Sequence, residues 1–275
     1  MEKNITTALY TKVSEEIRPV ILLVDDNEEI LEFIADDLSA RYEVLTARNG
    51  KEALAILQQE IVQLVISDVM MPEIDGFELC ESIKSGIEFS HIPVILLTAK
   101  DTLQAKIKGL ELGADAYVEK PFSPEFLQVQ IASLIKNRNK IKAYFASSPL
   151  IHLKSIAYSK ADEQFLGKLQ DTIHKNLENP DLDVDHLADK LNMSRPTFYR
   201  KIKAVSDLSP NELINLARLK RGAELLNEGL LKIYEISEKV GYSSQTHFGR
   251  NFLKQFGMSP TDYMNSKQAE KRNLY

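Results

Sequence analysis

The chain has 275 residues, of which 44% are hydrophobic and 27% are charged, and its formal net charge is −6. This length predicts about two globular domains, and no apolar stretch approaches the roughly 18 residues that a membrane-spanning helix needs. The single cysteine, Cys80, excludes an internal disulfide, and the N-terminus lacks the apolar core of a secretory signal. We therefore expect a cytoplasmic protein in which Cys80 is a packing residue.

The charge is unevenly divided along the chain. Residues 1–140 carry 14 Lys and Arg against 24 Asp and Glu, whereas residues 190–272 carry 15 against 8. An acidic front and a basic rear indicate a regulatory domain joined to a domain that binds a polyanion. The alternative for the basic part is a solvated helical surface.

Four short apolar runs each end in a polar residue: ILLVDD (21–26), LVISD (64–68), VILLT (94–98) and AYVEK (116–120). Short runs of Val, Ile and Leu bounded by turn residues are typical of buried parallel strands, and helical stretches lie between them. This alternation predicts a doubly wound α/β sheet, whose ligand site lies outside the carboxyl ends of the strands. The polar residues that should meet there are Asp25, Asp26, Asp68, Thr98 and Lys120.

This set of side chains suits a divalent metal and a phosphoryl group. Clustered carboxylates repel one another unless a cation is present, and Mg²⁺ takes hard oxygen ligands. Asp68 follows its strand alone, so it is the natural nucleophile for an aspartyl phosphate. Lys120 would neutralise phosphoryl charge, the Thr98 hydroxyl would donate to a phosphoryl oxygen, and a cis peptide before Pro121 would aim Lys120 inward.

Simpler interpretations remain for single residues. Asp25 and Asp26 also fit a solvated helix N-cap, and Asp75–Gly76 fits the turn that begins the helix at Phe77. Tyr117 alone fits a half-buried strand residue. A phosphatase built on this pocket would want a second Asp two residues after the nucleophile, but Met70 holds that position. We therefore expect no enzyme activity beyond the protein's own Mg²⁺-dependent phosphotransfer.

Residues 19–140 resemble a two-component response-regulator receiver domain. The matching elements, in order, are LVDDNE (23–28), SDVMMPEIDGFEL (67–79), ILLTAK (95–100) and GADAYVEKPF (113–122). The resemblance implies a flavodoxin-like fold with a five-stranded parallel sheet. It also implies that Asp68 accepts phosphate from a histidine kinase, that one Mg²⁺ is bound by Asp25, Asp26, Asp68 and the Met70 carbonyl, and that Thr98, Lys120 and Tyr117 respond to the phosphoryl group.

The rear half contains a hidden repeat. Residues 183–214 align with residues 232–264, so that Phe198, Arg200 and Ile202 fall on Phe248, Arg250 and Phe252 at an offset of 50. Each copy is typical of helix, short turn, N-capping serine, helix, and then a Ser-Pro that opens another helix. The stretch 215–229 should be one long helix that connects two helix-turn-helix units.

This pairing resembles the AraC/XylS-type DNA-binding domain, and its most specific segment is YSSQTHFGRNFLKQFGMSPTDYM (242–264). One departure is Asp207, which stands where the second copy has the turn glycine Gly257. We predict five segments: an extension over 1–18, a receiver domain over 19–140, a linker over 141–163, a DNA-binding domain over 164–266 and a tail over 267–275.

The second helix of each unit should enter a major groove, with the two units about one DNA turn apart. Arg pairs with guanine and Gln with adenine, so Arg195 and Gln245 are the best candidates for base readout. Arg200, Lys203, Arg250 and Lys254 fit phosphate contacts or helix-packing salt bridges. The full set of candidate DNA contacts is Arg195, Thr197, Tyr199, Arg200, Lys203, Ser244, Gln245, Thr246, His247, Arg250 and Lys254.

Together these features predict a transcription factor controlled by phosphorylation. Phosphate on Asp68 should favour a homodimer through the surface around residues 102–140, and the dimer should bind a double-stranded operator. The order of domains resembles the cytoplasmic C-terminal end of hybrid two-component sensors, which are anchored in the membrane. A free-standing regulator is the alternative, and a protein-docking role is the alternative for the rear domain.

Overall fold

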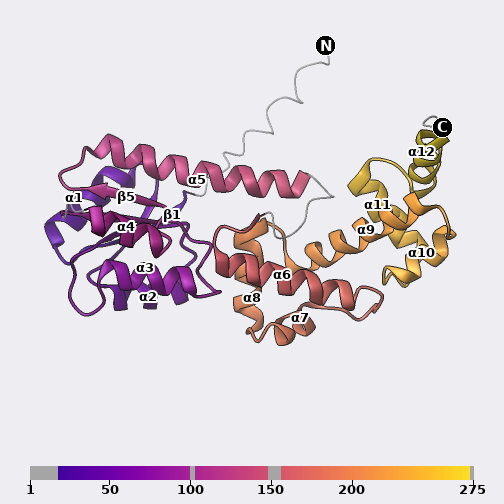
Figure 1. The fold of residues 1–275 in the computed structure, drawn as a ribbon, viewed down its shortest axis with the longest axis horizontal. Coiled ribbons are helices and arrows are strands. Elements are labelled where there is room, and N and C mark those ends of the chain that lie inside the picture. The colour runs from indigo at the N-terminus through magenta and orange to yellow at the C-terminus, as the bar shows by residue number, and fades with distance from the viewer. Residues whose placement is uncertain (1–17, 100–102, 148–155, 273–275) are drawn as a thin grey trace, which may run out of the picture.

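The computed structural model describes residues 18–99, 103–147 and 156–272 (Figure 1). Two domains follow one another along its long axis, an α/β domain and a helical domain. Almost all of the predicted extension over 1–18 and the middle of the predicted linker lie outside the described residues. Within the described part of the chain, no helix is long and apolar enough to cross a membrane.

The α/β domain alternates strands and helices, as the sequence predicts. Its five strands are all parallel and lie in the order β2-β1-β3-β4-β5, which is the doubly wound flavodoxin-like order. The elements are β1 (Val20–Val24), α1 (Glu28–Ser39), β2 (Glu43–Ala47), α2 (Gly50–Gln59), β3 (Leu64–Asp68), α3 (Gly76–Ser85), β4 (Val94–Thr98), α4 (Leu103–Glu111), β5 (Ala116–Glu119) and α5 (Pro124–Ser147).

The apolar runs of the sequence form the centre of this sheet. Every residue of β3 and β4 is buried, and alternate side chains of the strands enter two separate cores on the two faces of the sheet. The edge strand β2 is mostly exposed or half-buried. An edge strand lacks the continuous buried run that marks the central strands, which is why the sequence pattern did not reveal β2.

Both predicted ends of the linker need correction. Helix α5 continues seven residues past residue 140, to Ser147, because no helix-breaking residue occurs before the Ser-Ser-Pro that follows. Helix α6 begins at Lys160 rather than at residue 164. Its start is fixed by Ser159, whose side chain accepts a hydrogen bond from the Asp162 backbone N–H at 3.0 Å.

The helical domain contains the two predicted helix-turn-helix units. The first consists of α7 and α8, the second consists of α10 and α11, and the 19-residue helix α9 joins them. The elements are α6 (Lys160–Lys175), α7 (Val184–Lys190), α8 (Arg195–Ser206), α9 (Pro210–Glu228), α10 (Ile233–Lys239), α11 (Gln245–Phe256) and α12 (Pro260–Arg272). Helix α12 extends to Arg272 and so includes most of the tail that the sequence predicts over 267–275.

The two units have separate cores and equivalent turns. Phe198 and Ile202 are buried in the first core, and Phe248 and Phe252 are buried in the second. After α8, Asp207 adopts a left-handed conformation with φ of 62°, which matches the 72° of Gly257 after α11. The residue that departs from the repeat therefore keeps the same turn, because Asp tolerates this region better than most residues.

Candidate functional site: an acidic pocket and two helix-turn-helix units

Three of the predicted pocket residues meet at the carboxyl ends of the strands. The Lys120 ammonium lies 2.8 Å from Asp25 Oδ2 and 2.6 Å from Asp68 Oδ1. Asp25 follows β1, Asp68 ends β3 and Lys120 follows β5, so three strands that are far apart in sequence supply one charged cluster. The Lys120–Pro121 peptide bond is cis, one of the two forms that the sequence left open.

Backbone groups hold the two carboxylates in place. The Met70 N–H donates to Asp68 Oδ2 at 2.6 Å, and the Asn27 N–H donates to Asp25 Oδ1 at 3.0 Å. Both carboxylates are nearly inaccessible to water, whereas Asp26 is exposed at the rim. The helix N-cap of α1 is Asn27 and not Asp25 or Asp26, so the simpler interpretation of these two residues is wrong.

Burial and charge oppose each other in this pocket. Burial raises the pKa of Asp68 above its ordinary value, while the hydrogen bond from Lys120 acts to lower it. Burial alone would lower the pKa of Lys120, but its hydrogen bonds with Asp25 and Asp68 raise it above the ordinary value. Lys120 therefore stays charged, and it compensates for one of the two buried negative charges.

The remaining negative charge makes the pocket suitable for a cation. Mg²⁺ is commonly held by one or two carboxylates together with waters and phosphate oxygens. Asp25, Asp68 and the Met70 carbonyl are oxygen donors of this kind. Among the described residues, no group of three or more His, Cys, Asp and Glu side chains is placed to hold a metal ion.

The predicted switch residues Thr98 and Tyr117 lie on the neighbouring strands β4 and β5. Thr98 is fully buried at the end of β4. The ring of Tyr117 on β5 packs inward against Gly109 of α4, where an added Cβ would approach the ring to 3.2 Å. The Tyr117 hydroxyl is buried and has no hydrogen-bond partner in the described part of the chain. Cys80 is fully buried, as predicted.

In the first helix-turn-helix unit, the predicted DNA contacts divide into two groups. Arg195, Tyr199 and Lys203 are exposed, with Arg195 paired to Asp185 at 2.8 Å. Arg200 forms a packing salt bridge, one of the two roles predicted for it, and is not free to reach DNA in this structure. Its guanidinium donates to the Gln58 carbonyl at 2.8 Å and to Glu88 Oε1 at 3.0 Å, both in the α/β domain.

The second unit is open to solvent over its predicted contacts. Gln245, Thr246, His247, Arg250 and Lys254 are all exposed. Ser244 occupies the N-cap position as predicted, but its side chain makes no capping hydrogen bond. Thr197 in the first unit is half-buried and accepts a hydrogen bond from Ser194 Oγ at 2.9 Å.

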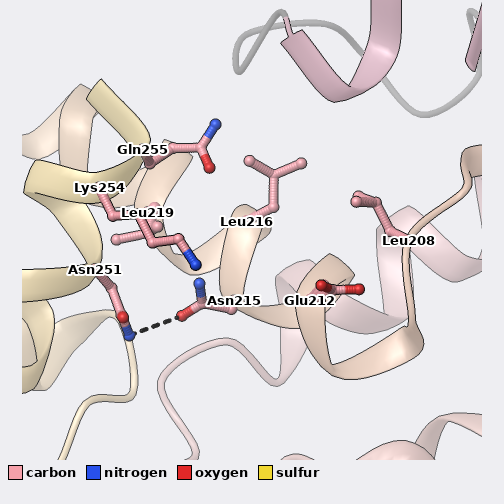
Figure 2. Close-up of a pocket in the computed structure, with 8 residues that line it drawn as sticks. All are labelled: Leu208, Glu212, Asn215, Leu216, Leu219, Asn251, Lys254 and Gln255. Atoms are coloured by element: carbon pink, nitrogen blue, oxygen red, sulfur yellow. Dashed lines mark hydrogen bonds between the residues drawn. The ribbon is translucent and has the colours of Figure 1, made fainter. Parts of the chain in front are cut away.

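Polar side chains lie where the second unit packs against the connecting helix α9. A cavity of about 170 Å³ lies there. Figure 2 shows the residues that line it, which come from α9, from α11 and from Leu208 just before α9. Asn251 Nδ2 donates to Asn215 Oδ1 at 3.4 Å, and the Tyr242 hydroxyl donates to the same oxygen. These bonds link the recognition helix α11 to α9, so the second unit is held at a fixed place on the connecting helix.

The sequence argument missed the polar residues between the two domains. Lys201 is fully buried and bonds to Asp162 of the helical domain and to Ser90 of the α/β domain. Nothing in the local pattern marks Lys201, since it is one of several basic residues on α8. Its position next to the buried face of the helix was the one available signal.

Comparison with known families agrees with this geometry. Residues 21–132 match the model of the response regulator receiver domain, and residues 187–266 match the model of a helix-turn-helix domain. The chain is a receiver domain joined to an AraC-type helix-turn-helix domain.

Two relatives of the chain are matched over very different shares of their own length. A protein called histidine kinase P4, from Formosa agariphila, is 41% identical over 253 residues, which cover 92% of this chain and 18% of that protein. A probable transcriptional regulator, ycf27, from Porphyra purpurea is 40% identical over 149 residues, covering 54% of this chain and 60% of that protein. The chain thus spans under two thirds of either relative.

The receiver domain also resembles solved structures. One is a CheY-like response regulator receiver domain protein from Methanospirillum hungatei JF-1, which is 31% identical to the matched part of this chain. The match covers 45% of this chain and 98% of that protein, with a TM-score of 0.43.

Proposed function

We propose that the chain is a DNA-binding transcription regulator switched by phosphorylation of Asp68. The observation that carries this proposal is the pocket in which Asp68 and Asp25 share Lys120, on a chain that also carries two helix-turn-helix units. A histidine kinase is the proposed phosphoryl donor, and a double-stranded operator is the proposed target.

The pocket residues suit a transfer from phosphohistidine. A carboxylate oxygen of Asp68 attacks phosphorus, the phosphorus–nitrogen bond breaks, and the imidazole leaves with the bonding electrons. Lys120, already 2.6 Å from Asp68 Oδ1, is placed to neutralise charge on the phosphoryl oxygens. Asp25, Asp68 and the Met70 carbonyl would hold one Mg²⁺, which supplies further charge neutralisation when bound. Asp26, which is exposed, is the further proposed Mg²⁺ ligand.

The same pocket argues against a separate enzymatic function. Met70 occupies the place at which a phosphatase would need its second carboxylate, and its N–H is already bonded to Asp68. We therefore propose that the receiver is modified about once by a donor and does not turn over exogenous phosphate esters.

A homodimer through α4, β5 and α5 is the proposed output of phosphorylation. Several large apolar side chains are exposed on these helices, namely Ile107, Leu110, Phe126 and Val129. Apolar patches of this kind mark protein–protein contacts. We also propose that the chain is part of a longer hybrid sensor. The support is its 41% identity to part of a histidine kinase.

The test is selection of DNA from a random-site library in the presence of Mg²⁺, with and without a small phosphodonor. Wild type is compared with Asp68→Ala and with Asp36→Ala, which makes the same change at the exposed surface of α1. We expect the phosphodonor to strengthen the selection of a repeated motif in wild type and Asp36→Ala but not in Asp68→Ala.

Two results would contradict the proposal in different ways. Equal selection in every state would keep DNA binding but remove phosphorylation as its control. No enrichment in any state would replace DNA binding by a protein-docking role. A strong loss of binding with added salt would support DNA binding, because phosphate contacts release counterions.

A further inference from the structure

The receiver domain holds the recognition helix of the first unit. Arg200 of α8 reaches across the domain boundary to the Gln58 carbonyl at the end of α2 and to Glu88 in the loop before β4. Ala204, one turn further along α8, and Ile61 of the receiver both line a cavity of about 80 Å³ between the domains. Two successive turns of the helix therefore lie against the receiver.

A buried polar cluster joins the same surfaces. Lys201 Nζ lies 2.5 Å from Asp162 Oδ1, 3.0 Å from Ser90 Oγ and 3.2 Å from His91 Nδ1. Ser90 Oγ in turn donates to Asp162 Oδ1 at 2.6 Å. Burial and the neighbouring Lys201 hold the pKa of His91 well below its ordinary value, so the neutral ring can accept from Lys201. Lys201 and Asp162 of the helical domain therefore bond to each other, and each also bonds to Ser90 of the receiver.

Helix α5 extends this cluster to the start of the helical domain. The Arg138 guanidinium donates to the His91 carbonyl and to Asp115 Oδ1, the latter at 2.9 Å. The Arg138 guanidinium also lies over the Tyr158 ring, with its Cζ atom 4.1 Å from the ring centre. The Tyr158 hydroxyl donates back to the Arg138 carbonyl at 3.1 Å. The contact is thus continuous from the loop before β4 to the residues that precede α6.

The side of α8 that contacts the receiver points away from the hydrophobic core of the first unit. Residues of an α-helix are about 100° apart, so Arg200 and Ala204 each lie about 160° around the axis from the buried Ile202. In a helix-turn-helix unit, the side of the second helix that is turned away from the core enters the major groove. The receiver therefore occupies part of the surface that a DNA groove would need, at Arg200 and Ala204, while Arg195, Tyr199 and Lys203 stay exposed.

We propose that the receiver masks the first helix-turn-helix unit, and that DNA binding through both units requires the receiver to leave α8. This proposal rests on the proposed DNA-binding function and names a control on it. These contacts lie at the amino ends of the strands, since Gln58 precedes β3, and Glu88 and Ser90 precede β4. Asp68 lies at the opposite, carboxyl end of β3. Release of the mask can therefore be tested without touching the phosphorylation pocket.

The second unit serves as an internal comparison. Arg250 occupies the position in α11 that Arg200 occupies in α8, and it is exposed. Masking should consequently affect the half-site read by α8 and leave the half-site read by α11 accessible.

The first test is the affinity of the unphosphorylated chain for its selected operator in wild type and Glu88→Arg. The substitution places a positive charge beside Arg200 without altering the helix-turn-helix domain. Glu32→Arg, on exposed α1, makes the same change in charge and is the matched control. We expect Glu88→Arg to bind at least about fivefold more tightly than either, as a coupling between two sites of this kind would give.

The second test closes the contact covalently. Cysteines at Ile61→Cys and Ala204→Cys are joined in the resting chain by a short, reducible bis-maleimide reagent, with each single-cysteine variant as control; the native Cys80 is buried. We expect a ready intramolecular crosslink. The crosslinked chain should bind the two-half-site operator about tenfold less tightly than the same sample after reduction of the reagent.

The outcomes separate this proposal from the proposed function. Tighter binding by Glu88→Arg together with recovery after reduction supports masking. Equal affinity in all forms, or failure to crosslink in the resting chain, overturns masking while DNA binding stands. Absence of DNA binding in every form, including the variant and the reduced sample, overturns the proposed function and the masking role with it.

Discussion

The two helix-turn-helix units are built alike but stand in different surroundings. Phe198 and Phe248 are both fully buried, and the turns after α8 and α11 have nearly the same left-handed conformation. The equivalent arginines differ, because Arg200 bonds to the receiver whereas Arg250 is exposed. The repeat therefore determines how each unit folds, and the neighbouring domain determines whether the equivalent arginine is exposed.

One substitution within the repeat accounts for much of this difference. The position that holds Lys201 in α8 holds Asn251 in α11. Lys201 is long enough to reach Ser90 and His91 in the receiver, whereas Asn251 turns to Asn215 of α9, 3.4 Å away. The long Lys201 side chain thus links the first unit to the receiver, and the shorter Asn251 side chain links the second unit to α9.

The largest expected effect comes from removing the carboxylate beside Lys201. We expect Asp162→Ala to cost the closed arrangement about 3–5 kcal/mol, because the ammonium is left buried without its counter-charge. Part of this cost is relieved if α8 separates from the receiver. Backbone hydrogen exchange, followed by mass spectrometry, should therefore become faster in α8 and stay unchanged in α11.

A double substitution controls for a general loss of structure. Asp162→Leu with Lys201→Met removes both charges and keeps apolar volume, so slow exchange in α8 should return. Asn251→Ala is the matched change in the second unit and should affect α11 and α9 alone. If α8 exchanges at the wild-type rate in Asp162→Ala, the buried ion pair does not hold the contact.

The two equivalent arginines give the next effect. In the unphosphorylated chain, we expect Arg250→Ala to weaken operator binding by about 1–3 kcal/mol, which is the usual range for loss of a specific arginine contact. Arg200→Ala should have a smaller effect, since its guanidinium is already engaged by Gln58 and Glu88. Fluorescence anisotropy with a labelled operator measures both. Equal losses in the resting chain would mean that Arg200 is as available as Arg250.

The smallest effect concerns the two turns. Gly257→Asp should lower the free energy of unfolding by about 1 kcal/mol, because a residue with a side chain is disfavoured at the φ of 72° found there. Asp207→Gly should be close to neutral, since relief at φ of 62° is offset by the loss of the contact between Lys203 and Asp207. Urea denaturation gives both values. A larger loss for Asp207→Gly would contradict the equivalence of the turns.

The parts of the protein that the sequence predicted share one property, which is that local pattern and position suffice to place them. Asp25, Asp68 and Lys120 each end or follow a strand of a parallel sheet, so the topology alone brings them together. The buried phenylalanines and the Ser-Pro helix starts follow from helical period and capping.

The parts that escaped prediction depend on packing between distant segments. Strand β2 is an edge strand with a mixed burial pattern, and α5 continues past residue 140 without a local stop signal. The roles of Lys201 and Arg200 are set by Ser90 and Glu88, more than 100 residues away. No periodicity within α8 distinguishes a basic residue that faces DNA from one that faces another domain.

A footprint of the operator by hydroxyl radicals tests the central claim most directly, with unphosphorylated wild type compared with Glu88→Arg. If the receiver masks α8, wild type protects the half-site of the second unit alone, and Glu88→Arg extends protection by about one DNA turn. Protection of both half-sites by the two proteins alike, at the same concentrations, would contradict the claim that the receiver holds the first unit away from DNA.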